Sequence, residues 1–286
     1  MTTSHPLRVG IAGLSGRMGQ MLVLSSLDAG CRVVGGTCRD IDGDGRGRAA
    51  LTRDGSITLC ANMAELADMS DVVIDFTHVS TVIPHAEALK KAGTAWVLGT
   101  TGLSGADQQA VNDAAKNIGV VQAANFSAGV TLVLRLAREM GAALPADRFD
   151  AEIVEMHHRQ KVDAPSGTAL AIGQAVADGR GVKFSDVRTP AREGQCGARK
   201  TGEIGFAALR GGQIVGEHTL LFTSGTEQIA LSHRAFDRRV FADGAVQAAE
   251  WLVRQKAGLY NMENVLGLGG KAPDMGVNDS SSGDAA

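Results

Sequence analysis

The sequence is poor in aromatic residues, in cysteine and in net charge, and it has no long apolar run. Aromatic residues make up 4% of the 286 residues, and the formal net charge of −3 comes without a basic stretch that would indicate nucleic acid or a membrane surface as partner. No apolar run is long enough to span a membrane, and we see no signal peptide. Cys31, Cys38, Cys60 and Cys196 lack metal-ligand spacing, so we expect no metal and a cytoplasmic, reducing location.

Glycine and apolar residues, by contrast, are plentiful. The chain has 37 glycines and 44% apolar residues, a composition typical of α/β proteins with many tight turns. The length allows two domains or one large one. We predict an α/β fold with a Rossmann-type parallel-sheet dinucleotide domain and a second α+β domain.

A glycine-rich turn follows the first predicted strand. Residues 7–12 are apolar and lead into Gly13-Leu14-Ser15-Gly16-Arg17-Met18-Gly19, which opens an apolar helix before a second strand at 32–37. Glycines at such a turn let backbone N–H groups approach a pyrophosphate, although a tight turn that binds nothing has the same pattern. Its place in the first βαβ unit favours a dinucleotide site.

Strands and helices continue to alternate as far as Ser127. The predicted strands are 72–76, 95–98 and 120–123, and the predicted helices are 79–92 and 107–117. Ligands of open α/β sheets lie beyond the C-terminal ends of the strands. Here those ends carry Asp75-Phe76-Thr77, Gly99-Thr100-Thr101 and Ala124-Asn125-Phe126. Each of these segments alone is equally typical of an ordinary strand-to-helix turn.

The second half of the chain has a different pattern. We predict a helix at 130–144, a strand at 151–156, a helix at 166–178 and a long polar loop at 179–202, for which a lid is a plausible role. Strand-like runs at 204–210, 213–222 and 227–233 predict an antiparallel sheet, and 241–256 predicts a helix that returns to the first domain. The expected domains are therefore 1–127 with 237–270, and 128–236. Residues 271–286 are predicted to be a disordered tail.

One string, His157 to Thr168, concentrates the chemistry. It places two histidines, two cations and Asp163 ahead of Ala164-Pro165, and then Ser166-Gly167-Thr168 opens an apolar helix. Ser166 is a typical N-cap, and free N–H groups at a helix start bind anions such as carboxylates. Histidines titrate near neutral pH. The string therefore indicates a site that holds an acidic small molecule and gives it a proton, although a polar loop is the alternative.

Taken together, these motifs resemble the 4-hydroxy-tetrahydrodipicolinate reductase family of the diaminopimelate route to lysine. The similarity runs from Leu7 to about Leu268. It depends on the glycine turn, the three strand ends and above all His157-His158-x-x-Lys161-x-Asp163-Ala164-Pro165-Ser166-Gly167-Thr168. The resemblance implies NAD(P)H-dependent reduction of a cyclic dicarboxylate in the cytoplasm by a homotetramer built through the second domain's sheet.

The resemblance also implies residue roles. His157 matches the general acid, Lys161 matches a substrate contact and a proposed proton donor, and His158, Gly167 and Thr168 match substrate contacts. The segments that match dinucleotide contacts are Gly13, Leu14, Ser15, Gly16, Arg17 and Met18; Gly99, Thr100 and Thr101; and Ala123, Ala124, Asn125 and Phe126. An imidazolium at His157 would deliver the proton, because the ordinary histidine pKa of about 6.5 lies near working pH.

Two positions depart from the family pattern. Ser15 replaces a frequent glycine, and Cys38 replaces the acidic residue that holds the ribose hydroxyls in some members. Arg39 offers a planar cation suited to a 2′-phosphate, so we expect NADPH to be used at least as well as NADH. Asp40 is the competing possibility, since its carboxylate could reach the ribose. Downstream, Asp40-x-Asp42-x-Asp44-Gly45 starts like a calcium loop but lacks the terminal glutamate, so we interpret it as a solvated turn.

Two other functions are compatible with part of the sequence. Another two-domain oxidoreductase, such as an amino-acid or sugar dehydrogenase, would share the first domain but lack the double-histidine string. A non-enzymatic dinucleotide sensor would have no use for a titratable cluster beside an anion site.

Overall fold

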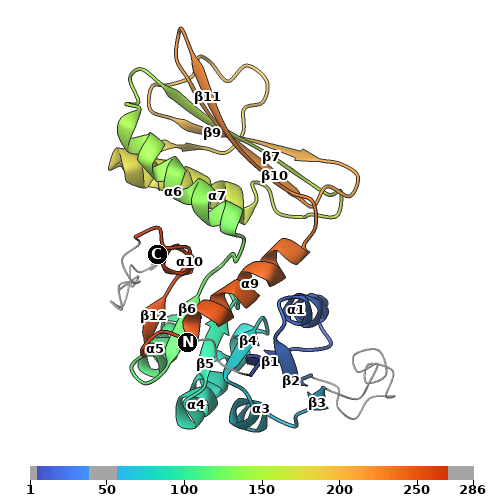
Figure 1. The fold of residues 1–286 in the computed structure, drawn as a ribbon. Helices are drawn as coiled ribbons and strands as arrows, with labels where there is room; N and C mark the ends of the chain where they lie inside the picture. Colours follow the sequence, from blue (N-terminus) through green and yellow to red (C-terminus); the bar gives the residue numbers. More distant parts are fainter. Residues whose placement is uncertain (1–4, 39–56, 270–286) are drawn as a thin grey trace, which may run out of the picture. The chain divides into compact units, whose positions relative to one another are not determined.

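The computed structural model describes residues 5–38 and 57–269, which belong to two compact units (Figure 1). Unit 1 is Met1–Phe126 with Arg239–Ala286, and unit 2 is Ser127–Arg238. Where the chain passes from one unit to the other, the boundaries expected from the sequence differ from these by one or two residues. Arg39, the acidic turn from Asp40 to Gly45 and the C-terminal tail lie outside the described residues.

Unit 1 is built on a seven-stranded sheet in which all neighbouring strands are parallel. The strand order is β12-β6-β5-β4-β1-β2-β3, so the order reverses at β1 and β4. Such a reversal is the switch point at which open α/β sheets bind ligands. The strands are β1 (Arg8–Ala12), β2 (Arg32–Thr37), β3 (Thr58–Leu59), β4 (Val72–Asp75), β5 (Ala95–Leu98), β6 (Gly119–Gln122) and β12 (Gly258–Tyr260).

Helices cover both faces of this sheet, and alternate residues of its strands face alternate layers. On β5, Val97 packs in the core with α1 and α9, while Trp96 and Leu98 pack in the core with α3, α4 and α5. This two-sided burial explains why the strands read as continuous apolar runs. The helices of unit 1 are α1 (Arg17–Asp28), α3 (Met63–Met69), α4 (Val82–Ala92, after a 3-10 turn at Val79–Thr81), α5 (Gly105–Ala115), α9 (Arg239–Leu252) and α10 (Met262–Val265).

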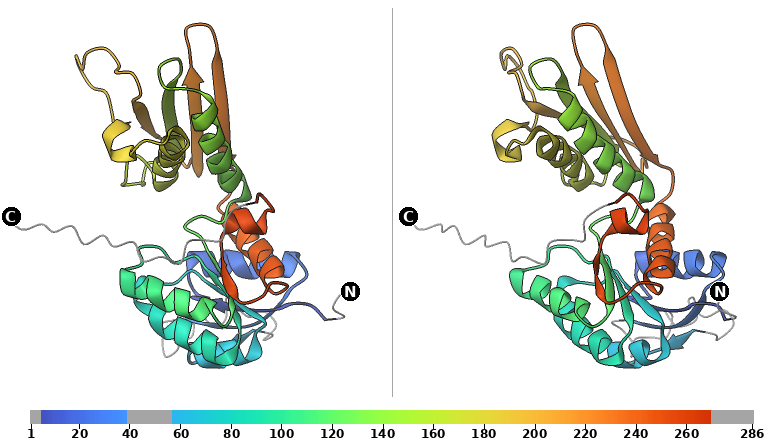
Figure 2. Two further views of the ribbon diagram at one scale, coloured as in Figure 1. Left: turned by 90° about the vertical axis from the view of Figure 1, so that its left-hand side faces the viewer. Right: turned by 60° about the vertical axis from the view of Figure 1, so that its left-hand side comes forward.

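Unit 2 has a five-stranded sheet with two long helices side by side on one face (Figures 1 and 2). The strand order is β11-β10-β7-β9-β8. The strands are β7 (Asp150–His157), β8 (Arg188–Thr189), β9 (Ile204–Arg210), β10 (Gly216–Thr223) and β11 (Gln228–Ala235), and the helices are α6 (Ala128–Ala143), α7 (Gly167–Arg180) and α8 (Phe184–Val187).

The prediction of a purely antiparallel sheet in unit 2 was wrong. β10 is antiparallel to β7 and β11, but β9 runs parallel to β7 and to β8, so the sheet is mixed. The three runs do not form a simple meander, because β7 lies between β9 and β10. The local sequence patterns predict that these runs are strands, but they do not indicate that β7 lies between β9 and β10. The last predicted helix also shifts, from 241–256 to Arg239–Leu252.

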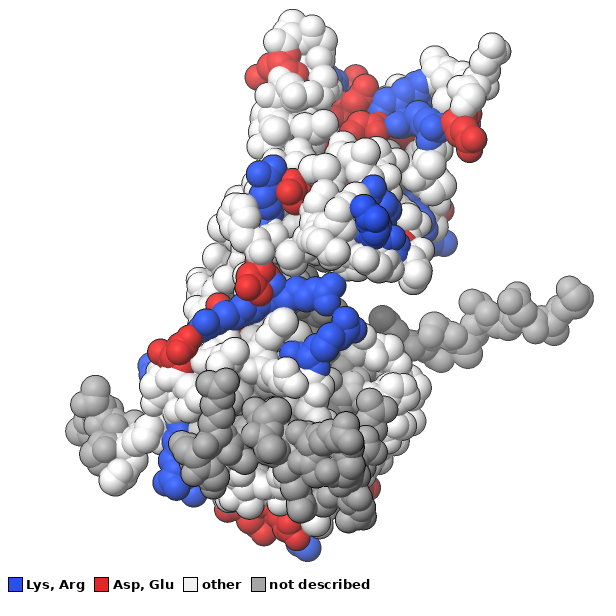
Figure 3. Space-filling view, turned by 90° about the vertical axis from the view of Figure 1, so that its right-hand side faces the viewer, with Lys and Arg blue, Asp and Glu red and all other residues white. Residues whose placement is uncertain are grey.

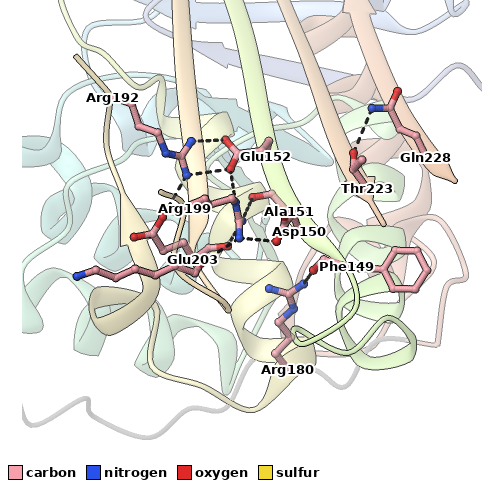
Figure 4. A network of polar contacts seen from close by, with 11 residues as sticks. Phe149, Asp150, Ala151, Glu152, Arg180, Arg192, Arg199, Glu203, Thr223 and Gln228 are labelled. Carbon is pink, nitrogen blue, oxygen red and sulfur yellow. Dashed lines mark hydrogen bonds and ion pairs between the residues drawn. The ribbon is translucent and has the colours of Figure 1, made fainter. Parts of the chain in front are cut away.

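The segment predicted as a polar loop at 179–202 is more regular than expected. α7 continues to Arg180, and α8 and β8 follow within the segment. Beyond them, Arg192 donates to both Glu152 carboxylate oxygens (2.8 and 3.0 Å), and Arg199 bonds Glu152 (2.9 Å) and Asp150 (2.7 Å), as Figure 4 shows. These charge-assisted bonds attach the segment to β7.

Charged side chains of both signs occur on each unit on the face drawn in Figure 3, with uncharged surface between the groups. Within residues 5–38 and 57–269, no helix is both long and apolar enough to cross a membrane. The same residues contain no group of three or more His, Cys, Asp or Glu side chains placed to hold a metal ion.

Candidate active site

A cleft in unit 1 lies at the C-terminal ends of the central strands. It has a volume of about 830 Å³ and is lined by Gly13, Ser15 and Gly16 after β1 and by Thr37 and Cys38 after β2, with residues that follow β3 and β4. Gly13 has φ +80°, which favours glycine. A Cβ on Gly19 would lie 2.3 Å from the Gly13 carbonyl oxygen, so the third glycine allows α1 to pack closely against the turn.

The start of α1 fits a dinucleotide phosphate. Its N-cap is Gly16, which has no side chain to cap the helix, so the first N–H groups of the helix can donate hydrogen bonds to an external anion. Ser15 and Gly16 are exposed at the cleft. Leu14 is fully buried with its side chain in the apolar core, and its backbone N–H already donates to the carbonyl of Thr37 (2.8 Å).

The other predicted cofactor segments follow β5 and β6 at the same edge. Thr100 Oγ1 donates to the carbonyl of Thr77 (3.3 Å), and a Cβ on Gly99 would lie 2.5 Å from the Phe76 ring. Glycine is therefore required beside Phe76. The segments Gly99–Thr101 and Ala123–Phe126 are not among the residues that line the cleft. Phe126 is buried against Phe76 with ring centroids 5.3 Å apart, so its side chain is part of the core.

Sequence reasoning missed a histidine–carboxylate pair in this cleft. His85 Nδ1 lies 2.7 Å from Oδ2 of fully buried Asp75, and Thr77 donates to Oδ1 through its backbone N–H (3.0 Å) and its hydroxyl (2.6 Å). Asp75 could have been predicted as a site residue, because it lies at the end of a strand. No sequence pattern marks His85, which lies on the first turn of α4.

The histidine string of unit 2 starts at the end of β7. This strand alternates between its two faces, and Ala151, Ile153, Glu155 and His157 all point to the buried side. Glu155 and His157 are 1% and 8% exposed. His157 Nδ1 lies 2.6 Å from Glu155 Oε2, and since an ionised carboxylate only accepts, Nδ1 carries the hydrogen. Nε2 is then the atom of His157 that can act on a substrate.

Charged groups converge on His157 from three segments. Arg210 of the neighbouring strand β9 donates to both oxygens of Glu155 (2.7 and 2.8 Å), and His218 of β10 meets the His157 ring edge-on at 5.1 Å between centroids. Burial lowers the pKa of His157, the Glu155 carboxylate partly opposes that change, and Lys161 and Arg210 lower the pKa further. Its pKa therefore lies below the ordinary 6.5 used in the sequence prediction, and the free enzyme holds His157 mainly neutral at pH 7.

The start of α7 has the features of an anion site. Ser166 is its N-cap, as predicted, and its hydroxyl accepts from Ala169 N (3.2 Å). A Cβ on exposed Gly167 would meet nothing within 4 Å, so its backbone has open space around it. Lys161 donates to Asp163 (2.8 Å), and its side chain is 21% exposed. His158 accepts from Arg238 (3.1 Å) at Nε2.

The structure thus brings together most of the predicted substrate-site residues within unit 2, and it adds three that the sequence prediction lacked. Glu155 could have been found from the alternation of β7, since it lies two residues before His157. Arg210 and His218 come from other strands, at positions that no local pattern marks.

Unit 1 has a parallel sheet with a glycine-rich turn suited to phosphate, and unit 2 has a buried histidine–carboxylate pair beside a helix N-terminus. These features are typical of a dinucleotide-dependent oxidoreductase. Both units match one family. Residues 7–126 match the N-terminal model of dihydrodipicolinate reductase, and residues 129–266 match the C-terminal model. The chain belongs to the dihydrodipicolinate reductase family, and it is therefore an enzyme.

The chain is similar to known enzymes over almost its whole length. The chain is 60% identical to the 4-hydroxy-tetrahydrodipicolinate reductase of Gluconacetobacter diazotrophicus, over 93% of this chain and 99% of that protein. It is 45% identical to the enzyme of the same name from Pseudomonas fluorescens, over 91% and 99%. Among solved structures, the dipicolinate-bound dihydrodipicolinate reductase from Paenisporosarcina sp. TG-14 is similar with a TM-score of 0.74, 25% identity and coverage of 91% and 99%.

The myo-inositol 2-dehydrogenase from Lactobacillus plantarum shares the fold alone. Its TM-score is 0.56 at 12% identity, with coverage of 87% of this chain and 88% of that one. A shared fold at this identity does not indicate a sugar substrate for this chain.

Proposed function

We propose that this chain reduces 4-hydroxy-tetrahydrodipicolinate to tetrahydrodipicolinate with NAD(P)H, in the diaminopimelate route to lysine. The carrying observation is the buried pair of His157 and Glu155 beside the Ser166-capped start of α7, in a chain whose two halves both match the reductase family. A cyclic dicarboxylate needs cations and N–H donors for its carboxylates and an acid for its ring, and unit 2 carries both.

The residues of unit 2 divide this work. Bound at the cleft of unit 1, the nicotinamide cofactor would supply the hydride. His157 Nε2 gives a proton to the ring atom on which the electron pair accumulates, so the ring gains one hydride and one proton. The 4-hydroxyl group of the substrate leaves as water, which accounts for the oxygen that the product lacks. Lys161 and the backbone N–H groups of Gly167 and Thr168 hold the carboxylates and fix the ring relative to the acid, while His158 gives a further contact. A dianionic substrate favours the imidazolium, which offsets the lowering of the His157 pKa by burial.

For the cofactor, we propose that NADPH serves at least as well as NADH. Cys38 lines the cleft at the end of β2, where a carboxylate would accept hydrogen bonds from the ribose and repel a 2′-phosphate. The next residue is Arg39, whose guanidinium suits a phosphate. Comparison of kcat/KM for the two cofactors tests this, and a strong NADH preference would refute it.

We also propose a homotetramer formed through the sheet of unit 2. One face of that sheet is covered by α6 and α7, and the other face carries partly exposed apolar side chains such as Val154, Leu209 and Leu221. Sedimentation equilibrium tests this assembly, and a monomer at micromolar concentration would refute it. The predicted cytoplasmic location is retained as part of the same proposal.

The activity itself is tested by following nicotinamide absorbance with substrate generated from pyruvate and aspartate semialdehyde. We expect turnover that depends on the substrate and falls by roughly 10²–10⁴-fold in His157→Gln. Absence of turnover by the purified wild-type chain with both NADH and NADPH would refute the proposed function.

A further inference from the structure

Glu155 occupies an unusual place for a carboxylate. It lies on the buried face of β7, in line with the core residues Ala151 and Ile153, and is 1% exposed. Its oxygens accept four hydrogen bonds, from His157 Nδ1 (2.6 Å), from Arg210 Nη1 and Nη2 (2.7 and 2.8 Å) and from the backbone N–H of Ser166 (3.0 Å). A buried carboxylate is costly unless it is paired and hydrogen-bonded, and here it is both.

These bonds join the two halves of the substrate site. One Glu155 oxygen is shared by His157 and Arg210, and the other is shared by Arg210 and Ser166 at the start of α7. Arg210 also donates to the carbonyl of Asp163 (2.6 Å), within the loop that carries Lys161. A change at Glu155 therefore reaches the acid, the anion-binding helix start and the loop between them.

The bond to Nδ1 has two consequences for the acid. It selects the form of the ring in which Nδ1 bears hydrogen and Nε2 is directed to the chemistry. It also stabilises the imidazolium, because the carboxylate is the one negative group among the charged and titratable residues that face His157, which are Glu155, Lys161, Arg210 and His218. Hydrogen bonds from Arg210 and His157 outweigh the effect of burial and keep the pKa of Glu155 below its usual value, so it stays charged.

We infer that Glu155, clamped by Arg210, is the positioning residue of the reduction: it orients His157, keeps a hydrogen on Nδ1 so that Nε2 is the atom that takes up and gives the proton, and ties the acid to the carboxylate-binding start of α7. This inference rests on the proposed function and adds two residues to it. Both act through His157 and the start of α7, so they are positioning residues and not catalytic residues.

The test is Glu155→Gln, which keeps the shape and removes the charge. The amide can donate to Nδ1 and so favours the wrong form of the ring, and the cation of Arg210 loses its partner. We expect kcat to fall about 10²-fold, within the range for loss of general acid catalysis. We also expect the pH at which activity falls on the alkaline side to move down by about one unit or more, since loss of a nearby opposite charge lowers a histidine pKa.

Glu152→Gln is the matched control. Glu152 lies on the same strand and is likewise held by arginines, Arg192 and Arg199 (Figure 4). The alternation of β7 places it on the opposite face from Glu155. A purely structural role of a β7 carboxylate would make the two variants behave alike. We expect the midpoint of the pH profile to stay at the wild-type value in Glu152→Gln and to move only in Glu155→Gln.

Nuclear magnetic resonance titration of the histidine rings separates this inference from the proposed function, because it requires no turnover. In the wild type, His157 should titrate with hydrogen on Nδ1 throughout, and in Glu155→Gln its pKa should be lower. An unchanged His157 pKa and ring form in the folded variant would overturn the inference, even if the enzyme is the proposed reductase. If Glu155→Gln does not fold, Glu155→Asp replaces it: the carboxylate retreats by one bond, about 1.5 Å, and an unchanged His157 pKa would again overturn it.

Discussion

Substitution of Lys161 by alanine should weaken the binding of dipicolinate, the planar dicarboxylate present in the related Paenisporosarcina structure. A charge-assisted hydrogen bond contributes about 1.5–3 kcal/mol. In the free protein, however, Lys161 already has a partner, because it donates a hydrogen bond to Asp163 at 2.8 Å. The Asp163 side chain is 54% exposed, so this pair contributes roughly 0–1 kcal/mol, and the ligand must displace or share it.

The net loss is therefore smaller than a free lysine would give. Subtraction of about 0.5 kcal/mol for the pair leaves about 1–2.5 kcal/mol, or roughly a 5- to 70-fold rise in Kd. Isothermal titration calorimetry with dipicolinate in the presence of saturating cofactor measures this directly. Asp163→Asn should have the opposite effect, about a twofold fall in Kd, since it frees the ammonium group.

Lys183→Ala is the control, because Lys183 is an exposed lysine in the same unit that precedes α8. It should bind dipicolinate like the wild type. If Lys183→Ala and Lys161→Ala weakened dipicolinate binding equally, the effect would come from the overall charge of the protein and not from a contact of Lys161. Unchanged binding in Lys161→Ala would show that the carboxylates lie elsewhere and would refute the assignment of the site.

Three further predictions concern the acid, its titration and the cofactor. His157→Gln should lower kcat by roughly 10²–10⁴-fold with cofactor affinity intact, measured by fluorescence titration; near-normal turnover would exclude His157 as the acid. Because burial lowers the pKa of free His157 and activity requires the protonated ring, kcat/KM should fall as pH rises through a value below 6.5. The fall in kcat, which reports the substrate complex, should come at higher pH, and coincident profiles would contradict this. Arg39→Ala should cost NADPH about 1–3 kcal/mol in kcat/KM and NADH little, and equal losses would show that Arg39 does not read the phosphate.

Much of unit 1 could be predicted from the sequence because its strands are buried on both faces. Strands β2 and β5 were predicted at their observed bounds, and β1, β4 and β6 to within one residue at each end, since apolar runs bounded by glycine or polar turns identify such strands locally. The Ser166 N-cap was equally local, because it depends on one side chain and the helix that follows. In a parallel α/β sheet, every strand end lies at the same edge as its neighbours, so these elements also predicted that the candidate cofactor segments share one edge of the sheet.

Only the tertiary structure decided the environment of the acid. The histidine string was visible in the sequence, but the strand order that inserts β7 between β9 and β10 was not, because pairing depends on which faces the helices bury and not on the pattern within a strand. That order brings Arg210 and His218, about fifty and sixty residues away in the chain, to Glu155 and His157. The pKa of His157 follows from this burial and these charges, so the sequence alone predicts His157 as the proton donor, whereas its acidity depends on the fold.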